Sequence, residues 1–393
     1  MARGGVGAVV HCHNPAGGDA LAEAKAVCQA ARDVGLRLAL ALPLCDRNAL
    51  AYGNSDRLLN LMSPGDRDKV RATWDPPTLS PAAQIERVEA IALDCEGDLI
   101  DIQYCPRGPQ WCSDVLLEKI AEASADTGRR IHTHLFETRY QREWADAHYP
   151  QGLIRYLDDI GFLSPRLTLA HGIWLRADEL DLLAARGVTI AVNTSSNLRL
   201  RSGLASYNAM LDAGIPVTFG LDGMSLHESN DAFEELRLNY HLHANPGLDG
   251  ESPTLADIFA AHRHGVVAVC DRQDGGVLEP GQPADFALLD YGAMTRDVVP
   301  DICSPAEIVL ARGSRHYLKA LWVAGRPVFD GDRVLGIDET ALQTEVNDML
   351  RHRAKSVYSL QPLVHRYQQA LQKYYGEGHH TSIDISHKHC SEA

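Results

Sequence analysis

Three side chains that can bind a metal ion or move a proton stand at the ends of three short apolar runs. They are His134, His171 and Asp222, and each run has the length and composition of a buried strand. Imidazoles and a carboxylate suit zinc or iron(II), and such a set leaves a coordination position open for water. Each residue alone has an ordinary explanation, since a histidine at a strand end is often only a hydrogen-bonded polar group and Asp222-Gly223 is a turn signal. Together they predict a site for one divalent metal ion, provided that the strands end at a common mouth.

Glu137 lies three residues beyond His134. There its carboxyl group could reach a substrate atom and shuttle a proton, although a solvated loop glutamate is the plain alternative. His132 lies on the same face of its strand as His134, because side chains two residues apart in a strand point the same way. His11 and His13 form an H-x-H pattern that could offer two ligands from one strand face. Because an ordinary helix follows within a few residues, we expect this pair to line a neighbouring strand at the mouth instead of binding the metal.

Apolar strands alternate with amphipathic helices along the first part of the chain. This rhythm is typical of parallel βαβ units, and the sequence has no glycine fingerprint for a dinucleotide. The predicted fold class is therefore α/β, a TIM-type (β/α)8 barrel, whose chemistry lies at the carboxyl ends of the strands. We expect strands at residues 7–10, 36–42, 99–104, 130–135, 167–170, 188–193 and 217–221. We expect helices at residues 19–34, from 81 onward, 114–127, 177–185 and 205–213.

The predicted strands are one short of the eight that a closed barrel needs. The chain opens only a few residues before the first of them, so we expect the missing first strand to lie upstream of Met1. An unclosed barrel leaves two strand edges to be covered.

After about residue 266 the pattern changes to turn-rich segments and short strands. A turn-rich stretch at 275–281 precedes a predicted strand at 284–289, and two short strands surround a turn near residues 321–328. We expect a small β portion here, followed by a long amphipathic helix. The chain is therefore divided into a barrel at 1–270 (strands two to eight), a β portion at 271–339, a C-terminal helix at 340–375 and a tail at 376–393.

The tail is polar and is predicted to be disordered. It contains His379, His380, His387 and His389, so metal binding in the tail is an alternative.

Composition and charge exclude several classes of protein. Of 393 residues, 45% are hydrophobic and 23% are charged, which is typical of a globular chain with a sizeable core. The 37 basic and 52 acidic residues give a net charge of −15, which disfavours a nucleic-acid partner. No run approaches the ~18 apolar residues of a membrane helix, and no signal peptide is evident. Nine scattered cysteines without a C-x-x-C pair indicate reduced thiols in the cytoplasm.

Five motifs, in this order along the chain, resemble a known family. They are IHTHLFET (131–138), AHGIWL (170–175), NTSSNL (193–198), FGLDG (219–223) and LEPGQPADFALL (278–289). Their conjunction resembles the amidohydrolase superfamily, and within it the branch of chlorohydrolases, guanine deaminases, cytosine deaminases and S-adenosylhomocysteine deaminases. The resemblance covers roughly residues 1–339 and is specific to the branch, not to one substrate.

The resemblance implies a role for each candidate residue. His134 and Asp222 match metal ligands from the fifth and eighth barrel strands. His171, from the sixth, matches a histidine that in this branch holds the hydrolytic water and in other branches binds metal. Glu137 matches the glutamate that protonates a ring nitrogen of the substrate. The segment after Leu278 resembles the C-terminal part of the family's composite β-sandwich.

Four further residues are expected to contact the substrate together with Glu137. Asn197 follows the seventh strand of the family's barrel, and Arg107 and Gln110 lie in the loop after the fourth. Trp174 stands where some deaminases carry a further histidine, which weakens any assignment of a particular substrate.

The chain departs from the family at the first strand. In relatives that strand ends in an H-x-H pair that supplies two metal ligands. In the register of the resemblance, His11 and His13 fall on the second strand, so the ligand role does not transfer to them.

The resulting hypothesis is a metal-dependent aminohydrolase with a small heterocyclic substrate, such as a purine, pyrimidine, pterin or triazine. A water activated by zinc or iron(II), oriented by His171 and deprotonated by Asp222, would attack the carbon that bears the amino group, and Glu137 would protonate the ring. The alternatives are amide or C–Cl hydrolysis on the same scaffold, or an inactive fragment that lacks half of the metal site. We expect no membrane partner and a homo-oligomer, either a dimer or larger.

Overall fold

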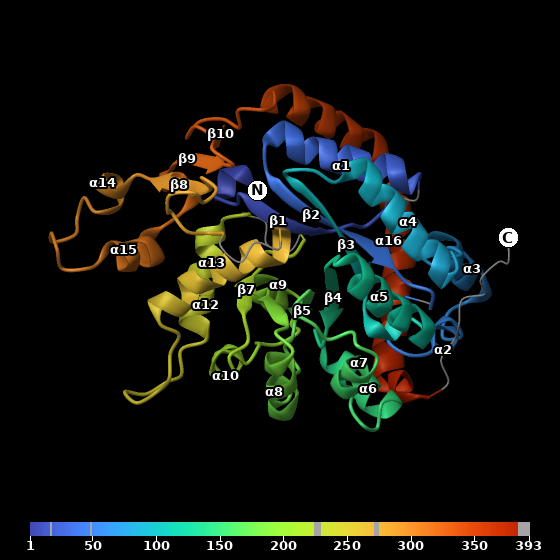
Figure 1. Cartoon of the computed structure of the whole chain (residues 1–393). Coiled ribbons are helices and arrows are strands. Elements are labelled where there is room, and N and C mark those ends of the chain that lie inside the picture. Colours follow the sequence, from blue (N-terminus) through green and yellow to red (C-terminus); the bar gives the residue numbers. More distant parts are fainter. Residues whose placement is uncertain (16–17, 48, 224–228, 271–274, 384–393) are drawn as a thin grey trace.

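Seven parallel strands form the centre of the protein. The computed structural model describes residues 1–15, 18–47, 49–223, 229–270 and 275–383. The strands pair in chain order into one sheet that curls as an open barrel with helices around it (Figure 1). The predicted TIM-type α/β fold is confirmed, and every predicted strand is present within a few residues of its predicted bounds. The strands are β1 (Ala8–Cys12), β2 (Arg37–Leu44), β3 (Ile100–Pro106), β4 (Ile131–Leu135), β5 (Leu167–His171), β6 (Thr189–Val192) and β7 (Val217–Phe219).

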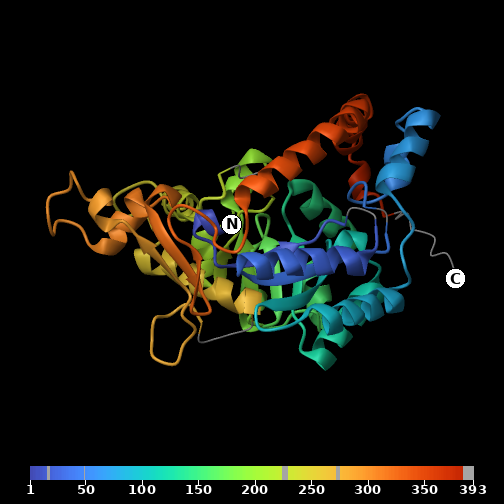
Figure 2. The ribbon, with the colours of Figure 1, turned by 90° about the horizontal axis from the view of Figure 1, so that it is seen from above.

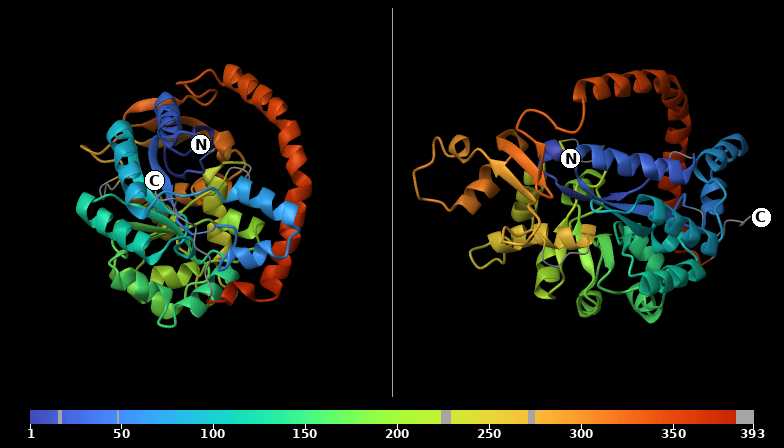
Figure 3. Two further views of the ribbon diagram at one scale, coloured as in Figure 1. Left: turned by 90° about the vertical axis from the view of Figure 1, so that its right-hand side faces the viewer. Right: turned by 45° about the horizontal axis from the view of Figure 1, so that its top comes forward.

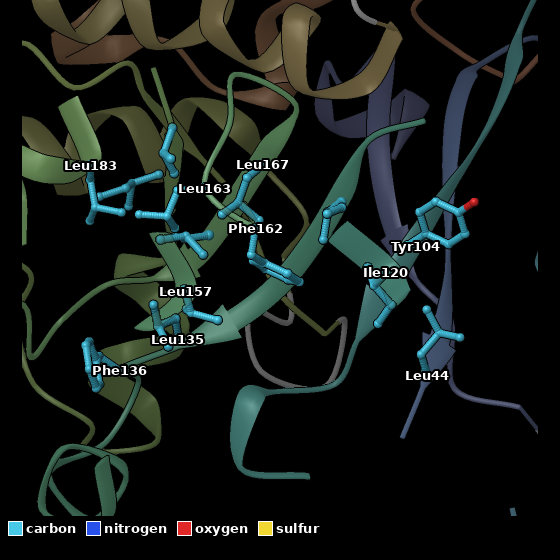
Figure 4. Close-up of a cluster of buried hydrophobic side chains, with 14 of the residues drawn as sticks. Leu44, Tyr104, Ile120, Leu135, Phe136, Leu157, Phe162, Leu163, Leu167 and Leu183 are labelled. Atoms are coloured by element: carbon cyan, nitrogen blue, oxygen red, sulfur yellow. The ribbon is translucent and has the colours of Figure 1, made fainter. Parts of the chain in front are cut away.

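Helices cover the outer side of the sheet, so its central strands are buried on both faces. Every residue of β2 except Pro43 is buried, as expected for a strand of a covered parallel sheet. Figure 4 shows part of this core, and Leu135, Phe162 and Leu167 belong to the same cluster of buried side chains. The covering helices that the sequence predicts are α1 (Ala20–Val34), α4 (Pro81–Cys95), α5 (Asp114–Thr127), α8 (Ala177–Ala185) and α10 (Tyr207–Asp212).

Helix α5 illustrates how local chemistry sets the bounds of a helix. Ser113 caps its first turn by accepting a hydrogen bond from the Leu116 amide at 3.1 Å. Gly128 ends it in the left-handed conformation, with φ 75°. Further helices that the strand pattern did not predict are α2 (Ser55–Leu59), α3 (Pro64–Trp74), α6 (Arg139–His148), α7 (Leu153–Asp159), α9 (Thr194–Arg199) and α12 (Ala232–Leu242).

Helix α13 (Leu255–Cys270) lies across the open side of the barrel. It contacts β7 at one edge of the sheet and both β1 and β2 at the other. His264 Nδ1 donates to the Val217 carbonyl of β7 at 2.9 Å, and Gln103 of β3 donates to the Ala268 carbonyl at 2.8 Å. A Cβ at Gly265 would come within 2.8 Å of Thr218 Oγ1, so glycine permits this close approach. The helix therefore covers the edges that seven strands leave open.

The predicted β portion is a three-stranded antiparallel sheet in the order β10-β9-β8. Its strands are β8 (Phe286–Leu289), β9 (Leu318–Val323) and β10 (Arg326–Phe329), with α14 (Tyr291–Met294), α15 (Pro305–Arg312) and η3 (Arg315–Tyr317) between β8 and β9. Its apolar side packs on η1 (Ala2–Gly4) and on Leu36 next to the barrel. Buried Arg37 of β2 forms an ion pair with Asp285 at 2.6 Å, which joins the two sheets.

The long C-terminal helix α16 (Glu339–Gly376) contains Pro362 and runs along the outside of the molecule with a marked bend (Figure 3). Its residues after Pro362, including Leu363 and Tyr374, pack on α2 and α3. The predicted helix is thus present. No helix in the described parts of the chain is long and apolar enough to cross a membrane.

The expectation of a disordered tail is wrong for residues 376–383. His379–Thr381 forms the short helix η4, which packs on α6 and α16. His380 is buried there, with Nε2 2.6 Å from Glu143 of α6. His387 and His389 lie outside the described residues. The sequence pattern could not reveal this anchoring, because it depends on a contact between residues far apart in the chain.

Candidate active site

His134, His171 and Asp222 lie at or just beyond the carboxyl ends of β4, β5 and β7, as the sequence predicts. The backbone turns sharply at these ends, since Phe136, His171 and Asp222 have φ values of 50°, 76° and 56°. Residues with a Cβ seldom adopt this left-handed conformation, and such strain is often held at functional sites. Gly172 continues the turn after His171, with φ 58°. Three strained strand ends therefore surround one mouth of the barrel.

His171 is fixed by two asparagines and faces a carboxylate. Its side chain is only 2% exposed, and its Nδ1 lies 2.8 Å from Asn197 Oδ1 and 3.4 Å from Asn193 Nδ2. The shorter bond assigns the proton to Nδ1, which leaves Nε2 as an acceptor 3.8 Å from the Glu137 carboxylate. Burial lowers the pKa of His171. A neutral imidazole with this tautomer can accept a hydrogen bond from a water molecule.

His134 lies against His171, with ring centroids 5.6 Å apart. Its Nδ1 donates to the carbonyl of Arg107 at 3.0 Å, so the Nε2 lone pair remains available. Burial lowers the pKa of His134, and a positive charge on His171 would lower it further. The imidazole is therefore neutral and its Nε2 can donate a lone pair, which is the form of histidine that binds a metal ion.

Asp222 completes the arrangement from the last strand. Ser196 Oγ donates to its Oδ2 at 2.5 Å, and the Gly223 amide donates to its Oδ1 at 2.7 Å. Its negative charge opposes the lowering of the pKa of both His134 and His171. This electrostatic coupling indicates that the carboxylate and the two imidazoles share one site.

Glu137 has the environment of a proton donor. Burial raises the pKa of its carboxyl group, and the charge of Asp222 raises it further, while His134 acts in the opposite direction. Its side chain is 21% exposed. Its backbone amide is held by Gln141 Oε1 at 3.0 Å. A carboxyl group that keeps its proton more readily than usual suits general acid chemistry.

The donor types at the mouth suit a divalent cation, but their number does not complete a site. His134 offers an imidazole nitrogen and Asp222 a carboxylate oxygen, which are common ligands of zinc. Within the described residues, however, no group of three or more His, Cys, Asp or Glu side chains is placed to hold a metal ion. The pair therefore fits as part of a ligand set and not as a whole one.

The remaining histidines near the mouth have other surroundings. His132 is buried beside Cys12 of β1 and so points into the barrel, a direction that strand periodicity left open. His13 lies 3.2 Å from Glu23 of α1, and its ring lies 5.8 Å from that of His11. The expectation that His11 and His13 line the mouth on a neighbouring strand stays a prediction.

The four other residues predicted to contact the substrate differ in their burial and in their hydrogen-bond partners. Gln110 is buried and accepts a hydrogen bond from Gln141 at 2.7 Å, and Trp174 Nε1 donates to the Ser202 carbonyl at 3.0 Å. Asn197 is buried against His171. The half-buried Arg107 donates to Asn14 Oδ1 at 3.1 Å. Of these residues, Arg107 is the one with a charged side chain, and its backbone carbonyl binds His134.

Sequence analysis missed several residues that orient the site. Ser196 and Asn193 stand inside the NTSSNL motif beside Asn197, so the motif itself was the signal that could have identified them. Gln141 holds both Glu137 and Gln110 from the first turn of α6. Its role carries no sequence signal, because it depends on how α6 lies against two loops.

An aromatic wall, formed by Tyr52 and Trp111, lies beside the mouth. Tyr52, in the segment after β2, stacks on Trp111 with ring centroids 5.7 Å apart. Burial and the charge of Glu137 raise the pKa of Tyr52, which places this ring beside the site. Tyr374 of α16 donates to the Tyr52 carbonyl at 2.9 Å, and Tyr375 accepts from the Tyr52 amide at 3.1 Å. The C-terminal helix thus holds the wall in place.

The fold and these strand ends define an open α/β barrel whose candidate site lies at the carboxyl ends of its strands. The sequence profile of the amidohydrolase family matches residues 1–328, and the chain belongs to that family. Its fold is similar to that of an adenosine deaminase from Xanthomonas campestris with bound zinc, at a TM-score of 0.73, 22% identity and coverage of 90% of this chain and 72% of that one. It is equally similar to a zinc complex of atrazine chlorohydrolase from Arthrobacter aurescens, at a TM-score of 0.73, 24% identity and coverage of 88% and 73%.

Curated relatives include two nucleoside deaminases. The chain is 32% identical to a 5′-deoxyadenosine deaminase of Methanosarcina barkeri over 61% of this chain and 55% of that protein. It is 35% identical to a 5-methylthioadenosine/S-adenosylhomocysteine deaminase of Thermococcus sibiricus over 49% of this chain and 45% of that protein. The chain spans about half the length of these relatives.

Proposed function

We propose that the protein is an aminohydrolase that replaces an amino group on a nitrogen heterocycle with oxygen. One observation carries the proposal: a neutral His171, a carboxyl group with raised pKa at Glu137 and a carboxylate at Asp222 surround one mouth. Water adds its oxygen to the ring carbon, the C–N bond breaks, and ammonia leaves. The names of the curated relatives favour a purine of the adenosine type as substrate.

Each residue has a distinct task in this reaction. The Nε2 acceptor of His171 orients the attacking water, and Asp222 accepts the proton that the water loses. Glu137 donates its proton to the ring nitrogen next to the carbon under attack, which neutralises charge that develops there. Asp222 then passes the proton that it took from water to the departing nitrogen, which leaves as ammonia, and the proton left on the added oxygen restores Glu137 as the carbonyl forms. Arg107 provides a positive group at the rim for the polar part of the substrate.

His134 and Asp222 would hold a divalent cation, zinc or iron(II), together with ligands that the described residues do not supply. Such an ion would lower the pKa of water toward neutrality. Zinc is favoured because both related structures named above were determined with that metal.

The free thiols of the described cysteines fit a protein of the reducing cytoplasm.

Ammonia release from a panel of adenosine derivatives, guanine, cytosine and aminotriazines tests the proposal. The full chain is assayed with added Zn²⁺ or Fe²⁺, beside Asp222→Asn and the control Asp212→Asn, an exposed aspartate of α10. We expect activity from wild type and the control, and none above background from Asp222→Asn. Equal activity in all three proteins would contradict the assigned role of Asp222.

Two other functions each have an observation in their favour. The fold shared with a chlorohydrolase favours C–Cl or amide hydrolysis at the same residues, and chloride release from a chlorotriazine without ammonia would identify it. The absence of three convergent ligands among the described residues favours a chain that is inactive by itself. For such a chain, a calorimetric titration with zinc would show no tight site, and no substrate of the panel would turn over.

A further inference from the structure

The part of α16 before Pro362 carries an apolar stripe that faces solvent. Residues 340–362 are exposed, apart from half-buried Ala354, and this part of the helix stands clear of the barrel (Figure 2). In proteins most of the stability of a helix comes from packing of an apolar face against other elements. By contrast, the part after Pro362 buries Leu363, Ala370 and Tyr374.

The exposed apolar residues recur at helical spacing. Positions three, four or seven residues apart lie on one side of a helix. The members of this stripe, between 37% and 62% exposed, are Leu342, Val346, Met349, Leu350, Val357 and Leu360. A contiguous apolar surface of this kind marks an interaction site.

Charge is distributed unevenly along the same segment. Its acidic residues, Glu339, Glu345 and Asp348, all precede its basic residues, Arg351, Arg353 and Lys355. Two such helices side by side in the same direction would place like charges together. In opposite directions, the acidic half of each helix meets the basic half of the other. The segment is therefore complementary to itself in the antiparallel arrangement only.

We propose that this stripe binds the same stripe of a second copy of the chain, antiparallel and about a twofold axis. An axis between Met349 and Leu350 sets these two side chains against their counterparts and brings Leu342 level with Val357 of the second copy. Glu345 then lies level with the basic residues around Arg353. A twofold axis requires one surface patch to be complementary to itself. The stripe meets this requirement in the spacing of its apolar residues and in the distribution of its charges.

Sedimentation velocity of the full chain, from about 0.1 to 50 μM, tests the proposal. We expect wild type to have the mass of two copies, and Met349→Asp to raise the dissociation constant about 30-fold or more, because it buries a charge in the apolar contact. Asn347→Asp adds the same charge to a neighbouring exposed residue outside the stripe, and it should remain a dimer. Circular dichroism and thermal melting verify that each variant is folded.

A charge exchange tests the antiparallel contact directly. One variant carries Glu345→Lys and Asp348→Lys, and the other carries Arg351→Glu, Arg353→Glu and Lys355→Glu. We expect each variant alone to be monomeric and an equimolar mixture to form a heterodimer. A monomeric wild type overturns the proposal, and so does a dimer whose mass is unaffected by Met349→Asp and by both charge variants.

Discussion

Replacing Arg142 with methionine should destabilise the protein by about 3–5 kcal/mol. Arg142 is buried on α6, where its Nη1 lies 2.7 and 2.9 Å from the two carboxylate oxygens of Glu179 on α8. Its guanidinium also binds Asp146 and lies 4.1 Å from the ring centroid of Phe136, the strained residue before Glu137. Methionine fills the volume but leaves the buried Glu179 carboxylate without its counter-charge, which is the costly way to break a buried pair.

The length of the chain allows this loss of stability to be expressed as a change in melting temperature. Unfolding entropy of about 2.1 cal/mol/K per residue gives about 0.8 kcal/mol/K for 393 residues, so a loss of 3–5 kcal/mol lowers Tm by roughly 4–6 °C. Scanning calorimetry and urea unfolding measure the change. The control is Arg176→Met, because Arg176 also binds Asp146, at 2.6 Å, but is half exposed and should cost less than about 1 kcal/mol.

The double variant Arg142→Met, Glu179→Met separates the charge effect from lost packing. It removes both charges, so it should be more stable than Arg142→Met alone, even though the Glu179 carboxylate also accepts from the Arg176 amide at the start of α8. The reasoning is refuted if Arg142→Met costs no more than Arg176→Met, or if the double variant is less stable than Arg142→Met.

Three other predictions concern pH, backbone strain and the aromatic wall. Burial lowers the pKa of His243 to about 4, so up to about 3 kcal/mol of stability is present above pH 6.5 and is lost as pH falls toward 4. His243→Gln should remove this pH dependence of the unfolding free energy in urea. If the unfolding free energies of wild type and variant change with pH in parallel, His243 is not the cause. Gly172→Ala places a Cβ at φ 58° and 3.1–3.4 Å from three side chains, including Met210, so it should cost about 1–3 kcal/mol, and a neutral effect in thermal unfolding would argue against strain. Tyr374→Phe removes the hydrogen bond to the Tyr52 carbonyl, so it should lower the free energy of unfolding by about 1 kcal/mol and make protease cleavage near residue 52 faster. An unchanged cleavage rate would show that the hydroxyl group does not hold the aromatic wall.

The parts of the fold that local sequence determines were predictable. Short apolar runs located the strands, and the helix predicted at 114–127 matches α5 to the residue, because caps and burial act within a few positions. The strand ends likewise located His134 and His171. The direction of His132 could not be predicted, since periodicity does not reveal which face of a strand points into a barrel.

Features that depend on distant contacts were not predictable. The tail was expected to be disordered, yet His380 is buried against Glu143, 237 residues earlier in the chain. The hydrogen bond from the Trp174 indole nitrogen to the Ser202 carbonyl also joins residues that no local pattern pairs, and the contact of Trp174 with substrate stays a prediction. Nothing in the composition of the residues that form α13 indicated that this helix would lie across the open side of the barrel.

The hold of α16 on Tyr52 has a consequence for the order in which the protein folds. The bond between Tyr374 and the Tyr52 carbonyl joins residues 322 positions apart. During synthesis the β2 end of the barrel is made long before the helix that fastens it. Contacts over such sequence separations are slow to form, because a long loop must close first. A ribosome-bound chain that still lacks α16 also lacks the hydroxyl group that binds the Tyr52 carbonyl, so this contact at the mouth can form only after nearly the whole chain has been made.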